Sequence, residues 1–146
     1  MVYNILLPFD SSANSIKALN FVKDLAFKLN AKVFLLSVFE SPSLLLMNPY
    51  EITPDILNEI EINFKTNINN IIEKSIKELQ KAGISTEVIT LKGDAGLLIV
   101  ETANEKECTF IVMDSRGLGK LKSLLMGSVS NYVLNHANCP VMIIKD

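Results

Sequence analysis

Apolar residues along the chain follow two patterns, short continuous runs and longer stretches with helical spacing. The runs at 2–8 and 32–39 are almost uninterrupted, which predicts strands buried on both faces of a sheet. Between them, apolar residues recur every three or four positions from Ile16 to Leu29, which predicts a helix. The chain therefore opens with a strand, a helix and a second strand.

The same alternation continues to the end of the chain. Thr53 as N-cap and Pro54 as first residue predict the start of a second helix, which Gly83 ends. Further segments are predicted as a strand at 86–91, a helix at 95–104, a strand at 109–113, a helix at 127–136 and a strand at 141–145. The order β-α-β-α-β-α-β-α-β predicts right-handed crossovers and an open parallel sheet with helices on both faces, in one domain spanning 1–146.

Composition narrows the class of protein. Apolar residues make up 49% and charged residues 21%, which excludes a disordered chain, and the net charge of −2 offers no attraction for nucleic acid or an anionic membrane. No apolar run approaches the ~20 residues that span a bilayer, and the N-terminus lacks the basic start of a secretion signal. Cys108 and Cys139 lack metal or redox spacing, so we expect buried thiols in a cytoplasmic protein.

Candidate binding residues follow the predicted strands, where open parallel sheets bind their ligands. They are Pro8, Asp10 and Ser11 at the end of the first strand, Val38 in the second, and Asp114, Arg116 and Gly117 after the fourth. Because the carboxyl ends of parallel strands share one edge of the sheet, these residues are expected to lie together. Neither GxxxxGK[ST] nor a complete GxGxxG is present, so no standard nucleotide motif explains them.

Gly127 and Ser128 lie where the last helix is predicted to begin. Their free backbone N–H groups and the positive end of the helix dipole would face an anion, and the hydroxyls of Ser128 and Ser130 supply further donors. Gly117 lets the backbone approach a phosphate closely, and Arg116 adds positive charge. Together these residues predict a phosphate pocket.

The motif of Gly117, nine residues and then Gly127-Ser128 resembles the second half of the pattern G-x-x-G, nine residues, G-[ST] in the nucleotide-binding branch of the universal stress protein family. ILLPFDSS at 5–12, KGDAG at 92–96 and GSVSNYVLNHANCPVMIIK at 127–145 are also similar to that family. The resemblance covers the whole chain. It implies a Rossmann-like, adenine nucleotide alpha hydrolase-like α/β fold with strand order 3-2-1-4-5, and a homodimer formed through the last strand, Val141–Lys145.

Carried over by position, the resemblance implies an ATP site. Asp10 and the backbone around Val38 would hold ribose and adenine. Gly117, Gly127, Ser128 and Ser130 would hold the phosphates, with Pro8, Ser11, Asp114, Arg116 and Val129 completing the site. Asp10 has a second open role, as the cap of the first helix, which Ser11 or Ser12 could share.

Asp114 is the departure from the family pattern, because it replaces the first glycine. Aspartate tolerates left-handed backbone angles, so the turn can survive the change. Its negative charge is the greater obstacle to phosphate binding, since repulsion between a carboxylate and a phosphate charge ~4 Å away costs on the order of 4 kcal/mol at an effective dielectric of 20. Three outcomes stay open: the side chain points away and ATP binds, Asp10 and Asp114 hold a Mg²⁺ beside the phosphates, or the nucleotide is lost.

The sequence favours a stress-response sensor or regulator that binds ATP or a related adenine nucleotide. Turnover should be slow at most, because no general base or arginine finger can be named. The alternatives are a dimeric interaction protein of the same fold that binds no nucleotide, and a slow metal-dependent nucleotide hydrolase. His136 is expected as a cap or surface residue, and the segment 41–55 as a lid or a docking patch for a partner.

Overall fold

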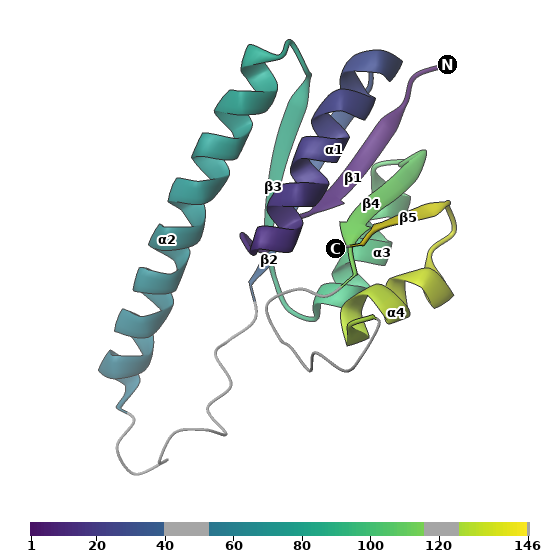
Figure 1. The fold of residues 1–146 in the computed structure, drawn as a ribbon. Coiled ribbons are helices and arrows are strands. Elements are labelled where there is room, and N and C mark those ends of the chain that lie inside the picture. The colour runs from purple at the N-terminus through teal and green to yellow at the C-terminus, as the bar shows by residue number, and fades with distance from the viewer. Residues whose placement is uncertain (40–52, 116–125, 146) are drawn as a thin grey trace.

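Five parallel strands form one sheet in the order β3-β2-β1-β4-β5 (Figure 1). This computed structural model describes residues 1–39, 53–115 and 126–145. The elements are β1 (Asn4–Pro8), α1 (Ala13–Leu29), β2 (Lys32–Phe39), α2 (Pro54–Lys81), β3 (Thr86–Lys92), α3 (Ala95–Glu105), β4 (Phe110–Asp114), α4 (Ser128–His136) and β5 (Val141–Ile144). The α/β class, the parallel sheet and the strand order are confirmed.

Several strand ends differ from the predicted ones, and strand pairing explains the differences. β1 begins at Asn4, two residues later than predicted, because pairing with β2 begins where Asn4 faces Lys32. β4 extends through Asp114, one residue further than predicted, since this aspartate still pairs with Ile144 of β5. The last strand correspondingly ends at Ile144 instead of position 145.

Side chains of the central strands enter two separate cores. On β1, Ile5 and Leu7 pack into the core under α1 and α2, whereas Leu6 packs into the core under α3 and α4. On β2, Leu35 joins the first core and Phe34 the second. Because successive strand residues point to opposite faces, a sheet covered on both sides needs apolar residues at consecutive positions. This requirement explains the uninterrupted apolar runs of the sequence.

The long helix α2 begins and ends as its sequence predicts. The Thr53 hydroxyl accepts a hydrogen bond from the N–H of Ile56 at 3.3 Å, and Pro54 is the first helical residue. Beyond the last turn, Gly83 takes a positive φ of 75° and its N–H donates to the carbonyl of Gln80 at 2.9 Å. A glycine adopts this conformation without a steric cost, which is why it ends the helix well.

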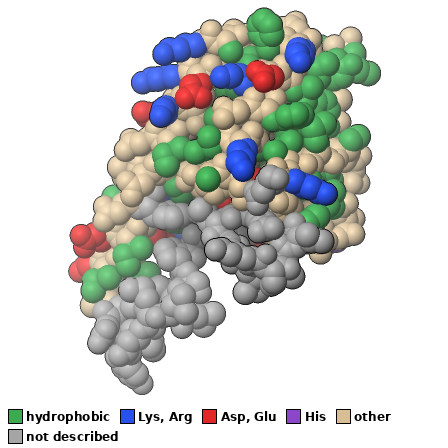
Figure 2. Space-filling view, viewed as in Figure 1, with side chains coloured by type: hydrophobic (Ala, Val, Ile, Leu, Met, Phe, Trp, Pro, Cys, Tyr) green, Lys and Arg blue, Asp and Glu red, His purple; other side chains and the backbone are tan. Residues whose placement is uncertain are grey.

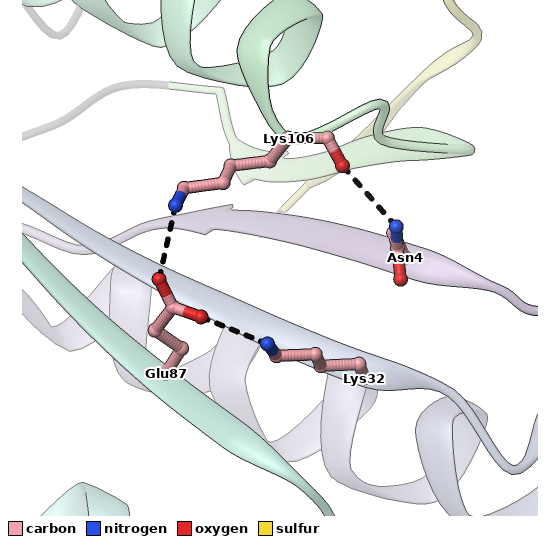
Figure 3. A network of polar contacts seen from close by, with 4 residues as sticks. All are labelled: Asn4, Lys32, Glu87 and Lys106. Atoms are coloured by element: carbon pink, nitrogen blue, oxygen red, sulfur yellow. Dashed lines mark hydrogen bonds and ion pairs between the residues drawn. The ribbon is translucent and has the colours of Figure 1, made fainter.

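A polar network joins the elements at the amino end of the sheet (Figure 3). Glu87 of β3 accepts hydrogen bonds from Lys32 of β2 at 2.8 Å and from Lys106 at 3.1 Å, while the Asn4 amide of β1 donates to the carbonyl of Lys106 at 3.2 Å. Both ammonium groups also lie over the ring of Phe34, 4.6 and 5.7 Å from its centroid. The hydrogen bonds from Lys32 and then Lys106 lower the pKa of Glu87. The network therefore connects the first residues of β1, β2 and β3 with the end of α3.

The surface is of mixed character. On the face shown in Figure 2, basic side chains lie among acidic and hydrophobic ones instead of forming one basic patch. Within the described residues, no helix is both long enough and apolar enough to cross a membrane.

Candidate functional site

The order of the sheet reverses between β1 and β4. From β1 the chain continues through α1 to β2 on one side, and β4 later adds on the other side, with Leu6 facing Ile111 in the register. Open parallel sheets bind ligands beyond the carboxyl ends of the strands at such a point. The predicted residues Pro8 and Asp114, the last residues of these two strands, therefore lie at the edge where a ligand is expected.

The turn after β1 is held by two side chains. The carboxylate of Asp10 accepts a hydrogen bond through Oδ1 from the N–H of Ser12 at 3.0 Å, and Ser11 between them has a φ of 65°. Ser12 caps α1, since its Oγ accepts from the N–H of Ser15 at 3.1 Å. Of the three candidate caps, Ser12 is therefore correct, while Asp10 and Ser11 shape the turn before it. Within the described residues the second oxygen of Asp10, Oδ2, accepts no hydrogen bond.

The backbone carbonyl of Ser115 fixes the start of α4. It accepts a hydrogen bond from the N–H of Gly127 at 2.6 Å and another from the buried hydroxyl of Ser130 at 2.8 Å. The same hydroxyl lies 3.1 Å from the carbonyl of Gly127. The N–H of Gly127, which the sequence suggested as a free donor, is thus already bonded. Sequence analysis could not find this contact, because nothing in the local pattern couples a carbonyl after β4 to a residue twelve positions further on.

At the start of α4, three backbone N–H groups find no acceptor among the described residues. The first hydrogen bond within the helix runs from the N–H of Asn131 to the carbonyl of Gly127 at 3.0 Å. The N–H groups of Ser128, Val129 and Ser130 donate no hydrogen bond within the described residues, and Gly127 as N-cap has no side chain to accept one. Free N–H groups at the positive end of a helix dipole bind anions well. Ser128 as a phosphate donor stays a prediction, with which this geometry is compatible.

Asp114 lies on the other face of the sheet from α4. It is buried, with 7% of its surface exposed, and it faces Ile144 across the strands. Strand alternation places it on the same face as Val112, which packs in the core under α1 and α2, whereas Val133 of α4 packs in the opposite core. Its carboxylate therefore points away from the open donors of α4.

Val38 lies near the carboxyl end of β2, on the edge where the other candidate residues gather. Its half-buried side chain packs against the core under α3 and α4, and the carbonyl of the next residue, Phe39, accepts a hydrogen bond from the N–H of Gly93 at 3.1 Å. The predicted residues Arg116 and Gly117 lie outside the described residues, as does most of the proposed lid or docking segment.

A metal site has no support beyond the predicted pair of aspartates. Among the residues that the structure describes, no three histidine, cysteine or acidic side chains lie close enough together to hold a metal ion. The pair formed by Asp10 and Asp114 stays a prediction.

The remaining reactive groups are structural. Burial raises the pKa of Cys108 to about 12 and also raises that of Cys139, so both thiols stay protonated and unreactive at neutral pH. Cys108 is buried as expected, whereas Cys139 is half-buried. The exposed ring of His136 lies at the end of α4, where its Nδ1 is 2.8 Å from the carbonyl of Tyr132. Its surface position is confirmed.

The fold is that of a Rossmann-like α/β protein, and the candidate site lies at the carboxyl ends of β1 and β4, where the strand order reverses. Comparison with known proteins agrees with this fold. The chain belongs to the universal stress protein family, because the sequence model of that family matches residues 1–145. The universal stress protein YxiE of Bacillus subtilis is 29% identical over 148 residues, which cover 99% of this chain and 100% of the relative.

Solved structures show the same fold. The protein MJ0577 of Methanocaldococcus jannaschii superposes with a TM-score of 0.86 and 29% identity, over 98% of this chain and 95% of that one. A universal stress family protein from Arabidopsis thaliana, solved with AMP bound, gives a TM-score of 0.71 and 21% identity, over 98% of this chain and 91% of its own.

Proposed function

We propose that this chain is a cytoplasmic stress-response sensor or regulator that binds ATP or a related adenine nucleotide between the carboxyl ends of β1 and β4. The observation that carries the proposal is the row of N–H groups from Ser128, Val129 and Ser130, which donate to no described residue and would bind the phosphates. On the opposite side of the switch point, Oδ2 of Asp10 would accept from the ribose, and the backbone around Val38 would hold adenine. AMP bound to the Arabidopsis relative supports an adenine nucleotide.

The direction of Asp114 supports binding without a bridging metal. Of the three outcomes that its charge left open, the one in which the side chain points away agrees best with its position on the α1 side of the sheet. The phosphates would then lie on the α4 side, and the carboxylate would neither repel them at close range nor need a Mg²⁺ between. The third outcome, loss of the nucleotide, corresponds to a dimeric interaction protein of the same fold.

Calorimetric titration with ATP tests the proposal. Wild type and Asp114→Gly would each be titrated with and without Mg²⁺, and we expect heat of binding from both proteins in both buffers. If the wild type gives no heat of binding both with and without Mg²⁺, the proposal is contradicted and the interaction protein is the better description. Binding that requires Mg²⁺ in the wild type alone would instead support the metal-assisted site formed by Asp10 and Asp114.

A second part of the proposal is a homodimer formed through β5. This strand is bonded to β4 on one side only within the described residues, and Met142 on it is 40% exposed. Figure 2 shows hydrophobic side chains gathered on the side of the molecule where Figure 1 places β4 and β5. Exposed apolar edge strands need a cover, and a second copy of the chain supplies one.

Light scattering after size-exclusion chromatography measures the oligomeric state. Met142→Lys should convert the dimer to a monomer, because a lysine would have to be buried in the interface. Val88→Lys is the matched control, since Val88 is exposed to a similar extent, 37%, on the opposite edge strand β3. A monomeric wild type, or dissociation by both substitutions alike, would contradict an interface at β5.

A further inference from the structure

Helices α3 and α4 pack against each other, and Gly96 and Tyr132 form a close contact between them. Gly96 lies in the first turn of α3 and is buried. A Cβ atom at this position would lie 2.7 Å from Cδ1, 3.0 Å from Cγ and 3.2 Å from Cβ of Tyr132. Real Cβ atoms do not approach other atoms to 2.7 Å, so only glycine fits here without a displacement.

The Tyr132 side chain cannot relieve the whole of such a clash. Rotation about its side-chain bonds can move Cγ and Cδ1, but Cβ is attached to the backbone and moves only with α4. The ring also stacks on His136, with ring centroids 4.0 Å apart and an angle of 15° between the planes, so turning it would cost this contact. A methyl group at position 96, with Cβ of Tyr132 at 3.2 Å, would therefore press on α4.

The contact lies one turn from the open donors. Tyr132 follows Ser128 by four residues and Val129 by three, so it stands above them on the helix. On the α3 side, the N–H of Gly93 bonds to the carbonyl of Phe39 at the end of β2, and Asp94 caps α3 by accepting from the N–H of Leu97 at 2.9 Å. The start of α3 is thus fixed to the strand end that carries Val38.

We propose that Gly96 and Tyr132 are positioning residues for the phosphate end of the nucleotide site. Together they set the distance between α3 and α4, and with it the place of the free N–H groups of Ser128, Val129 and Ser130 relative to the edge of β2. The hydroxyl of Ser130 fixes the same turn to Ser115 after β4, so this hydrogen bond and the contact with Gly96 act on α4 from different elements. This inference rests on the proposed nucleotide site and names what places its phosphate half.

A double-mutant cycle with two ligands tests the binding role. ATP and adenosine would be titrated into wild type, Gly96→Ala, Tyr132→Ala and the double variant. We expect Gly96→Ala to lower the affinity for ATP on the order of tenfold or more, because displaced donors no longer match the phosphates. The affinity for adenosine, which has no phosphates, should change less than about twofold by the same argument. In the Tyr132→Ala background the two shortest contacts are gone and only the one to Cβ, at 3.2 Å, is left, so the added methyl group should change ATP affinity much less.

Equal losses for ATP and adenosine, or an equal effect of Gly96→Ala in both backgrounds, would overturn the inference. Unchanged ATP affinity in a folded Gly96→Ala protein would overturn it as well. Thermal melting of each variant establishes that it is folded.

A measurement without nucleotide separates this inference from the proposed function. Residual dipolar couplings of the backbone N–H groups report the orientation of α4 relative to the sheet. We expect them to change in Gly96→Ala and to stay unchanged in Leu134→Ala, a control on an exposed position of the same helix. If Gly96→Ala does not fold, the same couplings would be measured in Tyr132→Ala, which creates no clash. The couplings of α4 should change in this variant too. No ATP binding by wild type would contradict the proposed function, whereas unchanged α4 couplings would contradict the positioning role.

Discussion

The two ends of the sheet use their polar groups in opposite ways. At the amino end, both carboxylate oxygens of Glu87 accept hydrogen bonds from lysines, and the amide of Asn4 donates to backbone carbonyls. At the carboxyl end, the first three N–H groups of α4 donate to nothing within the described residues. Satisfied groups stabilise a fold, whereas open donors on a fixed helix are available to a ligand. The difference supports the proposal that the carboxyl end binds a ligand, while the network at the amino end stabilises the fold.

The four helix starts sharpen this comparison. Ser12, Thr53 and Asp94 cap α1, α2 and α3, each with a side-chain oxygen that accepts a backbone N–H. α4 begins with Gly127, which has no such oxygen. A cap competes with an anion for the same N–H groups, and among the helices of the described residues the one proposed to bind phosphate begins without a side-chain cap.

The largest expected effect comes from removing one open donor. Ser128→Pro deletes a single N–H at the first helical position, where proline fits, and the extended conformation of Gly127 before it, with φ −75° and ψ 166°, suits a following proline. A hydrogen bond to a charged group contributes about 1.5–3 kcal/mol, so ATP should bind roughly 10- to 100-fold more weakly by calorimetry.

Ser128→Ala is the matched control, because it removes the hydroxyl and keeps the N–H. It should bind ATP more tightly than Ser128→Pro. Equal affinities of the two variants would mean that this N–H does not contact the phosphates. The thermal stability of Ser128→Pro should not fall, since this N–H donates to none of the residues that the structure describes.

A smaller effect is expected from the contact that fixes α4. Ser130→Ala removes the buried hydrogen bond to the carbonyl of Ser115 and should lower the free energy of unfolding by about 1 kcal/mol, measured by urea denaturation. Ser128→Ala, two residues away, should change it by less than about 0.5 kcal/mol, because its hydroxyl makes no hydrogen bond within the described residues. Equal stability of Ser130→Ala and wild type would show that the hydroxyl does not hold the helix.

Asp114→Asn should have a still smaller effect on binding. The side chain keeps its shape and loses its charge, and since it lies on the opposite face from α4, ATP affinity without Mg²⁺ should rise less than about fivefold. A gain of two orders of magnitude would show instead that the carboxylate faces the phosphates.

The smallest effect belongs to the amino end of the sheet. The lysines hold the pKa of Glu87 below its ordinary value of 4.5, so the carboxylate stabilises the folded state fully above pH 4.5 and ceases to do so as the pH falls through the lowered pKa. Glu87→Gln should therefore be slightly less stable than wild type at pH 7 by thermal melting, and the difference should vanish at lower pH and shrink in high salt.

ATP affinity should be the same in Glu87→Gln and wild type, because the network lies at the other end of the sheet. A change in affinity would contradict the separation of the two ends. A difference in stability that persists at low pH would contradict the role of the ion pairs.

Local signals in the sequence explain why the fold could be predicted. Strands buried on both faces need consecutive apolar residues, and Thr53, Pro54 and Gly83 mark helix ends by their own backbone preferences. The start of α4 was likewise marked by Gly127-Ser128, within one residue of the observed boundary. Each of these signals concerns neighbours in sequence.

The parts of the candidate site that could not be predicted depend on partners far along the chain. The bond from Gly127 to Ser115 and the contact between Gly96 and Tyr132 join residues that no periodicity relates. The choice of cap for α1 was also undetermined, because Asp10, Ser11 and Ser12 all carry a suitable oxygen. Only the folded structure determines which of these oxygens accepts a hydrogen bond from the first turn of the helix.

The shared carbonyl of Ser115 has a consequence for local unfolding. Since the N–H of Gly127 and the hydroxyl of Ser130 both bond to it, the start of α4 cannot separate from the end of β4 without losing two hydrogen bonds at once. The amide hydrogen of Gly127 should therefore exchange with deuterated solvent only when the two elements come apart.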